Sequence, residues 1–456
     1  MIAKVEAVAV SDARRLSGGI AEVALLAYPA VLQTLSDTAM QVTDSAIVGR
    51  LGVTELGAVG FGGVWLWTML VAFVGTATGV QTFVSQAFGA GETRRCGRWA
   101  WQGLYVLLPL TALWVGVIAL GFQPLLRVLG PSAELQMLAT RYVHARLFGA
   151  PAVIAGVALT SFFRGLGDTR TPLVGTVFAN LLNVLLAIGL VFGRFGLPAL
   201  GVAGAGTATA CANWTYTGIM LSAFLRRRMR ETYATQPVRP DRDAIRRFVR
   251  TSMPVGGQWV LDMTSFALFS TIIARMGNAP MAASQAMIQL LSLSFMQAFG
   301  ISIAAGALVG RYVGAADLAS AERSHRSAMQ LGLVLATLVA VIFVAVPDTL
   351  LSIFTRDATV VALGRPLLAL GAGFQLLDAI GIIAGGSLRG AGDTRWPFMV
   401  QTALAWCVRL PLVYLIAVVL GRGVIGAWLG ELGYVAVLGS VWLLRFRAGV
   451  WRGIRI

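Results

Sequence analysis

Two short segments of this sequence are nearly identical: Arg164 to Pro172 reads RGLGDTRTP, and Arg389 to Pro397 reads RGAGDTRWP, 225 residues later. The same offset relates three further pairs: Pro29 and Pro254, 50–52 (RLG) and 275–277 (RMG), and 89–90 and 314–315 (both GA). Matches at one constant offset, spread over more than a hundred residues, indicate that the chain contains two copies of one structural unit.

The composition is that of a membrane protein. Of the 456 residues, 57% are hydrophobic and only 12% are charged, and the mean hydropathy is +0.77. Soluble domains carry roughly twice this fraction of charge. Apolar windows long enough to span a bilayer as a helix recur twelve times, near 23–48, 57–84, 99–122, 139–163, 173–193, 201–225, 251–274, 281–309, 328–352, 366–388, 397–420 and 424–444. We therefore predict an all-α polytopic membrane protein with twelve transmembrane helices.

The duplication divides these windows into two sets of six. Because an even number of helices separates equivalent positions, the copies are expected to run parallel and to enclose a central cleft, a recurring transporter plan. We predict an N-terminal lobe at 1–225, a basic cytoplasmic linker at 226–250 and a C-terminal lobe at 251–456. The RGxGDTRxP links suit tight turns, in which Asp168 and Asp393 cap backbone amides.

The basic residues are distributed unequally between the two predicted sides of the membrane. The net charge is +16, and 26 of the 36 Lys and Arg residues lie in the N-terminus, in the links after even-numbered windows or in the C-terminal tail. Cytoplasmic loops collect positive charge, so both termini are expected in the cytoplasm. The charge therefore indicates topology rather than nucleic acid binding. The first twenty residues lack an apolar region with a cleavage site, so no cleaved signal peptide is expected.

The sequence lacks the residues that several classes of function require. The three cysteines are scattered, and His144 and His325 stand alone, so neither disulfides nor a metal site are predicted. The chain has no GxxxxGK[ST], HExxH or GxSxG motif. We expect no enzyme and no cofactor, and we expect the driving energy to come from an ion gradient or from a partner.

Two acids stand inside the first window, within QTLSDTAMQVTDSAIVGRLG (33–52). Asp37 and Asp44 are seven residues apart, almost two helical turns, so they project from nearly the same face. An acid at mid-bilayer costs roughly 2.5–3.5 kcal/mol, which indicates a function such as cation binding. Burial favours the neutral form of a carboxyl group, so such an acid can load and release a proton. Asp37 is either a second proton site or a neutral group hydrogen-bonded to Thr34, Ser36 or Thr38.

The second copy carries its own charges inside windows. Asp262 and Asp378 lie in the seventh and tenth windows, and Arg409 in the eleventh needs a counter-charge. A salt bridge from Arg409 to Asp378 or Asp262 is expected, either permanent or broken when a cationic substrate enters. At the 225-residue offset Asp37 corresponds to Asp262, so these two acids are candidates for a pair facing each other across the cleft, whereas Asp44 corresponds to Phe269.

The order of these features resembles the multidrug and toxic compound extrusion (MATE) family, closest to its DinF-like branch. The features are TDSAIVGRLG in the first window, the paired RGxGDTRxP links, FANLLNVLL after the first link and FQLLDAIGIIAGGSLRGAGDT in the tenth window. The resemblance covers essentially the whole chain. It implies a cation-coupled antiporter of the bacterial inner membrane, which exports amphipathic and often cationic organic compounds by rocker-switch alternating access. It further implies a monomer that exchanges its substrate for H⁺ or Na⁺.

The resemblance also assigns roles in the first lobe. Asp44 matches the family's first-helix acid, in the pattern D-[ST]-x-x-V-x-x-L-G, which is implicated in proton or sodium binding. Asn180 and Asn183 match its N-x-x-N pattern and either coordinate a cation, hydrogen-bond Asp44 or join helices. Many relatives place an Asp four residues after the second Asn, where this chain has Ala187. This lobe is therefore one acid short, unless Asp37 replaces the missing acid spatially, and the shortage favours H⁺ over Na⁺.

In the second lobe, Asp262 and Asp378 resemble acids that other branches of the family use for cation binding, and Gln375 lies one turn from Asp378. We expect this lobe to bind a cation or the substrate. The alternative function is a flippase for lipid-linked or other amphipathic intermediates. Such a protein would line its cleft with several basic residues, whereas the windows of this chain are expected to hold one Arg, Arg409, and four acids.

Overall fold

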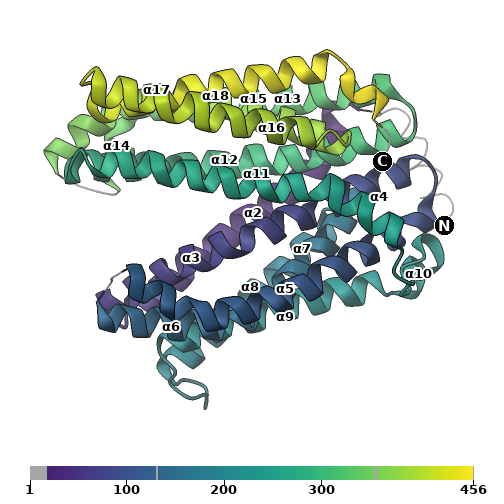
Figure 1. Cartoon of the computed structure of the whole chain (residues 1–456), viewed down its shortest axis with the longest axis horizontal. Helices are drawn as coiled ribbons and strands as arrows, with labels where there is room; N and C mark the ends of the chain where they lie inside the picture. Colours follow the sequence, from purple (N-terminus) through teal and green to yellow (C-terminus); the bar gives the residue numbers. More distant parts are fainter. Residues whose placement is uncertain (1–17, 130–131, 354–356, 455–456) are drawn as a thin grey trace. The chain divides into compact units, whose positions relative to one another are not determined.

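The computed structural model describes residues 18–129, 132–353 and 357–454, and every regular element in these ranges is a helix (Figure 1). The expectation about a signal peptide concerns residues 1–17, which lie outside these ranges. The first repeat contains α2 (Ile20–Gly49), α3 (Val53–Thr78), α4 (Val80–Gly89), α5 (Thr93–Leu129), α6 (Ala133–Leu147), α7 (Ala150–Gly165), α8 (Arg170–Phe192) and α9 (Val202–Phe224). The short helix α10 (Arg227–Tyr233) follows.

The second repeat has the same plan. It contains α11 (Arg242–Ala274), α12 (Asn278–Gly314), α13 (Leu318–Ala345), α14 (Pro347–Ser352), α15 (Ala358–Gly390), α16 (Arg395–Leu404), α17 (Leu410–Tyr414) and α18 (Gly423–Arg447). The π-helical turns η1 (Ala405–Arg409) and η2 (Leu415–Val419) flank α17, and a 3₁₀ turn η3 (Val450–Gly453) follows α18. All twelve predicted windows are helical, so the fold class is confirmed.

By length and hydropathy alone, eight helical stretches of the described residues could cross a membrane, or nine if the α6–α7 pair, bent by 48°, is one span. The three remaining windows correspond to α2, α9 and α11. Two of these, α2 and α11, carry intramembrane acids, and α9 is rich in Ala, Gly and Thr. The helices that fail a purely apolar test therefore include those that hold polar side chains for the sites described below.

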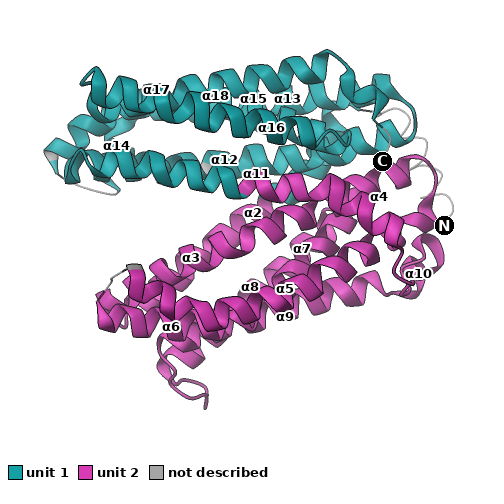
Figure 2. Cartoon of the chain, in the orientation of Figure 1, with its two compact units in different colours: residues 1–31, 260–456 teal, residues 32–259 magenta. Residues whose placement is uncertain are grey.

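Contacts divide the chain into two compact units, residues 32–259 (unit 2) and residues 1–31 with 260–456 (unit 1) (Figure 2). The lobes predicted at 1–225 and 251–456 follow the sequence repeat, whereas these units follow packing. The two divisions differ in α2 and α11, each of which begins in one unit and ends in the other. Each unit is described by itself below.

The two RGxGDTRxP links form turns, as predicted. Gly167 and Gly392 both have positive φ, +85° and +89°, a conformation that glycine adopts without strain. Asp168 accepts hydrogen bonds from the backbone N–H of Arg170 and Thr171, at 3.1 and 3.0 Å, and so starts α8. Asp393 takes part in an ion pair, since it accepts from Arg445 Nε of α18 at 2.9 Å.

The linker at 226–250 is attached to α5 in unit 2. Three side chains of α5 donate to its backbone carbonyls: Trp101 to Thr235 (2.9 Å), Tyr105 to Val238 (2.8 Å) and Gln102 to Arg239 (3.1 Å). Asp241 then accepts from the backbone N–H of Ala244 and Asp243 at the start of α11 and pairs with Arg98. These contacts hold the pKa of the Asp241 carboxyl below its ordinary value, with the Ala244 N–H as the largest cause. The linker is therefore a fixed segment of unit 2 rather than a free tether.

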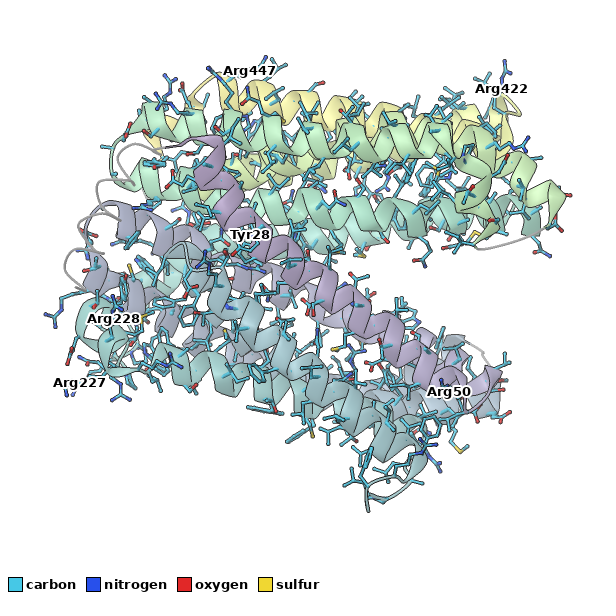
Figure 3. All side chains as sticks on the ribbon, turned by 180° about the vertical axis from the view of Figure 1, so that it is seen from behind. Tyr28, Arg50, Arg227, Arg228, Arg422 and Arg447 are labelled. Atoms are coloured by element: carbon cyan, nitrogen blue, oxygen red, sulfur yellow. The ribbon has the colours of Figure 1, made fainter. Side chains whose placement is uncertain are left out.

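Basic residues predicted on opposite sides of the membrane lie at opposite ends of each unit (Figure 3). In unit 2, Arg227 and Arg228 lie at one end of the bundle and Arg50 lies at the other. In unit 1, Arg447 and Arg422 are separated in the same way.

One close helix contact in unit 2 gives a stability prediction. A Cβ atom added to Gly256 of α11 would lie 2.2 Å from the carbonyl oxygen of Ala72 in α3, whereas one added to Gly60 of α3 would meet nothing within 4 Å. We expect Gly256→Ala to destabilise the protein by about 1–3 kcal/mol, as overpacking does. The control Gly60→Ala should be neutral or stabilising by up to about 1 kcal/mol, because alanine favours a helix over glycine. Thermal unfolding of the purified protein measures both, and equal melting temperatures would contradict this contact.

Candidate functional site

The first candidate site lies in unit 2 and is centred on Asp44 of α2. Asn183 of α8 donates from Nδ2 to one carboxylate oxygen at 2.6 Å. The Thr209 hydroxyl of α9 lies 3.3 Å from the other oxygen and shares its hydrogen between Asp44 and the Ala205 carbonyl of its own helix, at 3.0 Å. Sequence reasoning predicted the bond from Asn183 as one alternative and missed Thr209. Threonine is common in membrane helices, so its presence in the sequence does not indicate a site. The packing of α9 beside α8 brings the Thr209 hydroxyl close to Asp44.

Asn183 also leaves an acceptor unfilled. Its side chain is fully buried, and its Oδ1 has no hydrogen-bond partner within the described ranges. Its Nδ2 is bonded to Asp44, so this oxygen and the carboxylate belong to two adjacent side chains. A carboxylate and an amide oxygen side by side are suitable ligands for a small cation or for a protonated group. Buried unpaired acceptors are uncommon, and they mark places where a ligand or water is bound.

The second acid of α2, Asp37, has different neighbours. Asn180 donates from Nδ2 to the backbone oxygen and the hydroxyl of Ser36, at 3.1 and 2.9 Å, and also hydrogen-bonds Asp37. The Thr38 hydroxyl bonds back to the Thr34 carbonyl of its own helix. The two asparagines of N-x-x-N therefore serve different acids, Asn180 near Asp37 and Asn183 at Asp44. Asn180 contacts Ser36 and Asn183 contacts Asp44, so residues further along α8 contact residues further along α2, as expected for two parallel helices.

Arg164 provides a positive charge close to Asp37. Its guanidinium donates to Gln33 Oε1 of α2 at 2.8 Å, and its charge acts on Asp37. Gln33 in turn donates to Thr176 and Tyr216, at 3.0 and 3.2 Å. Arg164 begins the first RGxGDTRxP link, whose arginines were interpreted as cytoplasmic charges. The structure instead turns this side chain toward the interior of unit 2, beside an intramembrane acid.

Asp44 likewise has an arginine within electrostatic range, Arg146 at the end of α6. Its Nη1 donates to the Tyr142 hydroxyl one turn earlier on α6, at 2.6 Å. Sequence reasoning counted Arg146 among the link residues although it lies in the fourth window. Each acid of α2 thus has its own basic neighbour, and we define the first cluster as Asp37, Asp44, Asn180, Asn183 and Thr209.

The second candidate site lies in unit 1 and contains Arg409 of η1, which is only 3% exposed. Of the two expected partners, Asp378 and Asp262, the structure pairs Arg409 with Asp262, but its closer partner is an acid that was not expected. Arg409 pairs through two points with Glu431 of α18, Nε to Oε2 at 2.7 Å and Nη2 to Oε1 at 2.6 Å. Asp262 is a more distant partner, 3.7 Å from Nη1.

Glu431 is the acid that sequence reasoning missed. It lies in the middle of the twelfth window, and Asp348 lies near the end of the ninth, so the windows hold six acids rather than the expected four. Glu431 could have been recognised from the sequence, because an acid in an apolar window is as costly there as Asp44 is in the first window and so indicates a function or a partner. Glu431 is 3% exposed. A buried arginine and a buried glutamate that satisfy each other in this way are the usual solution for charges inside a protein.

Around this ion pair lie the other residues of the second lobe. Gln401 hydrogen-bonds Asp262, and the charges of Asp262, Glu431 and Arg409 all act on Asp378. Gln375 is 3% exposed, and neither its Oε1 nor its Nε2 has a partner in the part of the chain that is described. We define the second cluster as Asp262, Gln375, Asp378, Arg409 and Glu431. It contains three acids, one base and one unsatisfied amide.

The two clusters do not repeat each other residue for residue. At the 225-residue offset, Asn180 and Asn183 correspond to Ala405 and Val408, and Arg409 corresponds to Val184. The duplicated framework therefore carries two differently equipped sites. Asp37 and Asp262 belong to different units, so the predicted pairing of these two acids across a cleft stays a prediction.

Comparisons with known proteins identify the framework. The MatE family model matches the chain twice, at residues 29–189 and 254–415. These two matches begin 225 residues apart, which confirms the duplication. Similar curated proteins include the probable multidrug resistance protein NorM of Deinococcus radiodurans, 32% identical over 93% of this chain and 95% of that protein. The NorM proteins of Pseudomonas aeruginosa (30%, 94% and 89%) and Thermotoga maritima (28%, 94% and 92%) are also similar.

Solved structures show the same fold. An outward-facing multidrug resistance MATE family transporter of the MOP superfamily superposes with a TM-score of 0.88 over 96% of this chain and 98% of its own, at 18% identity. A point mutant of the Vibrio cholerae MATE transporter VcmN gives a TM-score of 0.85 over 94% and 97%, at 21% identity. The three curated relatives are NorM proteins, so the closer likeness to the DinF-like branch stays a prediction.

Proposed function

Because this chain belongs to the MatE family of multidrug and toxic compound extrusion transporters, we propose that it is an antiporter that exports amphipathic, often cationic, organic compounds in exchange for entering cations. As a member of this family it is a transporter and not an enzyme. Its small organic substrates reach it from the bilayer or the cytoplasm. We place it in the bacterial inner membrane as a monomer, with both termini cytoplasmic, as the distribution of basic residues favours.

The observation that carries the proposal is Asp44 in its surroundings. A carboxylate inside an apolar helix accepts a hydrogen bond from Asn183 and lies within reach of the Thr209 hydroxyl, which also contacts the Ala205 carbonyl. The Asn183 amide oxygen has no partner among the described residues. A purely structural acid would satisfy its neighbours fully, whereas an unfilled acceptor beside it leaves room for an ion. The first cluster therefore suits reversible loading of a cation from one side and its release to the other.

The second cluster suits a cation or the substrate. Glu431 neutralises Arg409, which leaves Asp262 and Asp378 as the negative charges of this cluster. Gln375 adds an amide whose donor and acceptor groups are both unused within the described ranges. A lipophilic organic cation can approach two carboxylates in an apolar wall at little desolvation cost of its own. We assign Asp262, Gln375 and Asp378 to substrate or cation binding.

The exchange then follows alternating access. Outward-facing protein takes up the coupling ion at Asp44, which disfavours the bound organic cation and releases it to the outside. Inward-facing protein loses the ion to the cytoplasm and regains affinity for a new substrate. The coupling free energy is the difference in substrate affinity between the loaded and unloaded states, and it acts equally on both ligands.

We take H⁺ rather than Na⁺ as the coupling ion. A dedicated sodium site needs several fixed oxygen ligands, and Ala187 removes the acid that many relatives are expected to place in α8. Asp37 does not take the place of the missing acid beside Asp44, because the neighbours of Asp37 are Asn180, Ser36 and Arg164. One carboxylate with two hydrogen-bond donors is sufficient to bind a proton.

The test is transport in proteoliposomes under separately imposed gradients. Purified protein is reconstituted, ethidium serves as the cationic probe, and its movement is followed by fluorescence with a pH gradient alone, a Na⁺ gradient alone, both or neither. We expect the pH gradient alone to drive ethidium against its own gradient, with no added effect of Na⁺. Movement driven only by Na⁺ would reverse the ion assignment, and movement that neither gradient drives would refute antiport.

A further inference from the structure

Glu431 is a buried acid that the proposed ion exchange does not use. Both of its carboxylate oxygens are engaged by Arg409, at 2.6 and 2.7 Å, and the two side chains are 4% and 3% exposed. Two parallel N–H···O bonds fix the plane of a guanidinium as well as its position. Glu431 therefore determines where the single positive charge of the second cluster lies.

Arg409 has a second acid within reach. Its Nη1 donates to the Ser265 hydroxyl at 2.5 Å and lies 3.7 Å from a carboxylate oxygen of Asp262, too far for a hydrogen bond. Asp262 and Ser265 are on the same helix, α11, one turn apart. Arg409 and Asp262 therefore form a loose ion pair without a hydrogen bond. A small rotation of the guanidinium would bring it within hydrogen-bond distance of Asp262, and the bonds to Glu431 oppose that rotation.

The charge balance shows what such a change would do. With Arg409 bound to Glu431, Asp262 and Asp378 remain as two carboxylates, and Asp378 forms no ion pair among the described residues. With Arg409 bound to Asp262, this acid would be occupied by a permanent internal cation. It could then no longer exchange a proton or an organic cation.

We propose that Glu431 is a positioning residue, which holds Arg409 away from Asp262 and so keeps Asp262 and Asp378 available to the exchanged cation or to a cationic substrate. This inference rests on the proposed antiport. It assigns to Glu431 an effect that passes through Arg409 rather than a contact with the transported ion or compound.

The proposal predicts opposite effects of the two partners on pH dependence. The charged or titratable groups around Asp262 are Asp378 of α15, Arg409 of η1, and Glu431 and Tyr434 of α18. Glu431→Gln leaves Arg409 unneutralised beside Asp262, so protonation of Asp262 requires a lower pH. Arg409→Gln leaves an additional negative charge, so protonation occurs at a higher pH. Removal of both charges restores the balance.

The experiment measures the initial rate of ethidium export in proteoliposomes at a constant pH difference while the absolute pH is varied. Because a cationic substrate binds the ionised form of Asp262, export should fall to half its maximum on acidification at a pH set by Asp262. We expect this pH to fall by about one unit or more in Glu431→Gln and to rise in Arg409→Gln, as expected for a charge within a few ångströms. It should return toward the wild-type value in the double variant. Glu431→Asp, which keeps the carboxylate charge on a side chain one methylene shorter, should shift the midpoint less than Glu431→Gln.

The outcomes separate this inference from the proposed function. If wild-type protein shows no gradient-driven export, the antiport itself fails. If wild type exports but the two single variants shift the half-maximal pH in the same direction, or not at all, Glu431 does not act through Arg409. If the single variants do not fold, the double variant decides: recovered export with a near wild-type pH midpoint supports the proposal. A double variant that neither folds nor exports contradicts it, because the pair would then serve only the fold.

Discussion

Replacement of Asp44 by Asn is expected to abolish gradient-driven export while leaving the protein folded. The amide has nearly the same shape as the carboxyl group and can still accept a hydrogen bond from Asn183 or Thr209. It cannot bind and release a proton, so the cycle has no coupling step. Ethidium export under a pH gradient should fall to the level of protein-free liposomes, whereas ethidium binding to the purified protein should persist.

A matched control lies one residue away on the same helix. The Thr43 hydroxyl donates to the carbonyl of Ala39 within α2, so Thr43→Val removes a polar group that does not belong to the first cluster. This variant should export at close to the wild-type rate. Coupled export in Asp44→Asn at a rate similar to that of Thr43→Val would remove Asp44 from the mechanism.

Removal of Arg409 alone is expected to cause the largest loss of stability. Arg409→Met leaves Glu431 buried and without a counter-charge, and breaking a buried pair in this way costs roughly 3–5 kcal/mol. Replacing both members by methionine removes both charges and fills a similar volume with apolar atoms, which is often neutral or stabilising. Thermal unfolding of the purified variants should therefore give a much lower melting temperature for the single variant than for the double variant.

A surface pair provides the control. Arg227 and Glu231 of α10 pair at 2.8 Å, but their side chains are 93% and 63% exposed. Exposed pairs contribute only about 0–1 kcal/mol, so Arg227→Met should leave the melting temperature nearly unchanged. Additive losses in Arg409→Met and Glu431→Met, with no recovery in the double variant, would show that the two side chains act independently.

The framework of this protein could be predicted from its sequence, because each signal is local or repeated. Twelve apolar windows predicted twelve helical segments, and a constant offset predicted the duplication. Asp44 and its partner Asn183 could also be named, since both lie in short patterns within single helices. The positive φ values of Gly167 and Gly392 follow in the same way from the two glycine-containing links.

The pairing of side chains between helices could not be predicted in the same way. Thr209 reaches Asp44 only because α9 packs beside α8, and a hydroxyl in a membrane helix has no distinctive pattern. The basic link around Arg164 predicts a cytoplasmic surface position, but the long side chain of this residue extends back to Gln33. Glu431 is a different case: the acid was visible in its window, and only the choice among three acids for Arg409 needed the structure.

Substrate export and cation entry are proposed to be obligatorily coupled. The most direct test of this coupling is to measure ion movement that is driven by a substrate gradient. Proteoliposomes with a trapped pH indicator are prepared without any ion gradient, and an ethidium gradient is then imposed across the membrane. Because coupling is reciprocal, ethidium moving down its gradient should drive protons in the opposite direction. We expect this proton movement in wild-type protein and its absence in Asp44→Asn. Ethidium movement through the wild-type protein with no opposing movement of H⁺ or Na⁺ would contradict the account.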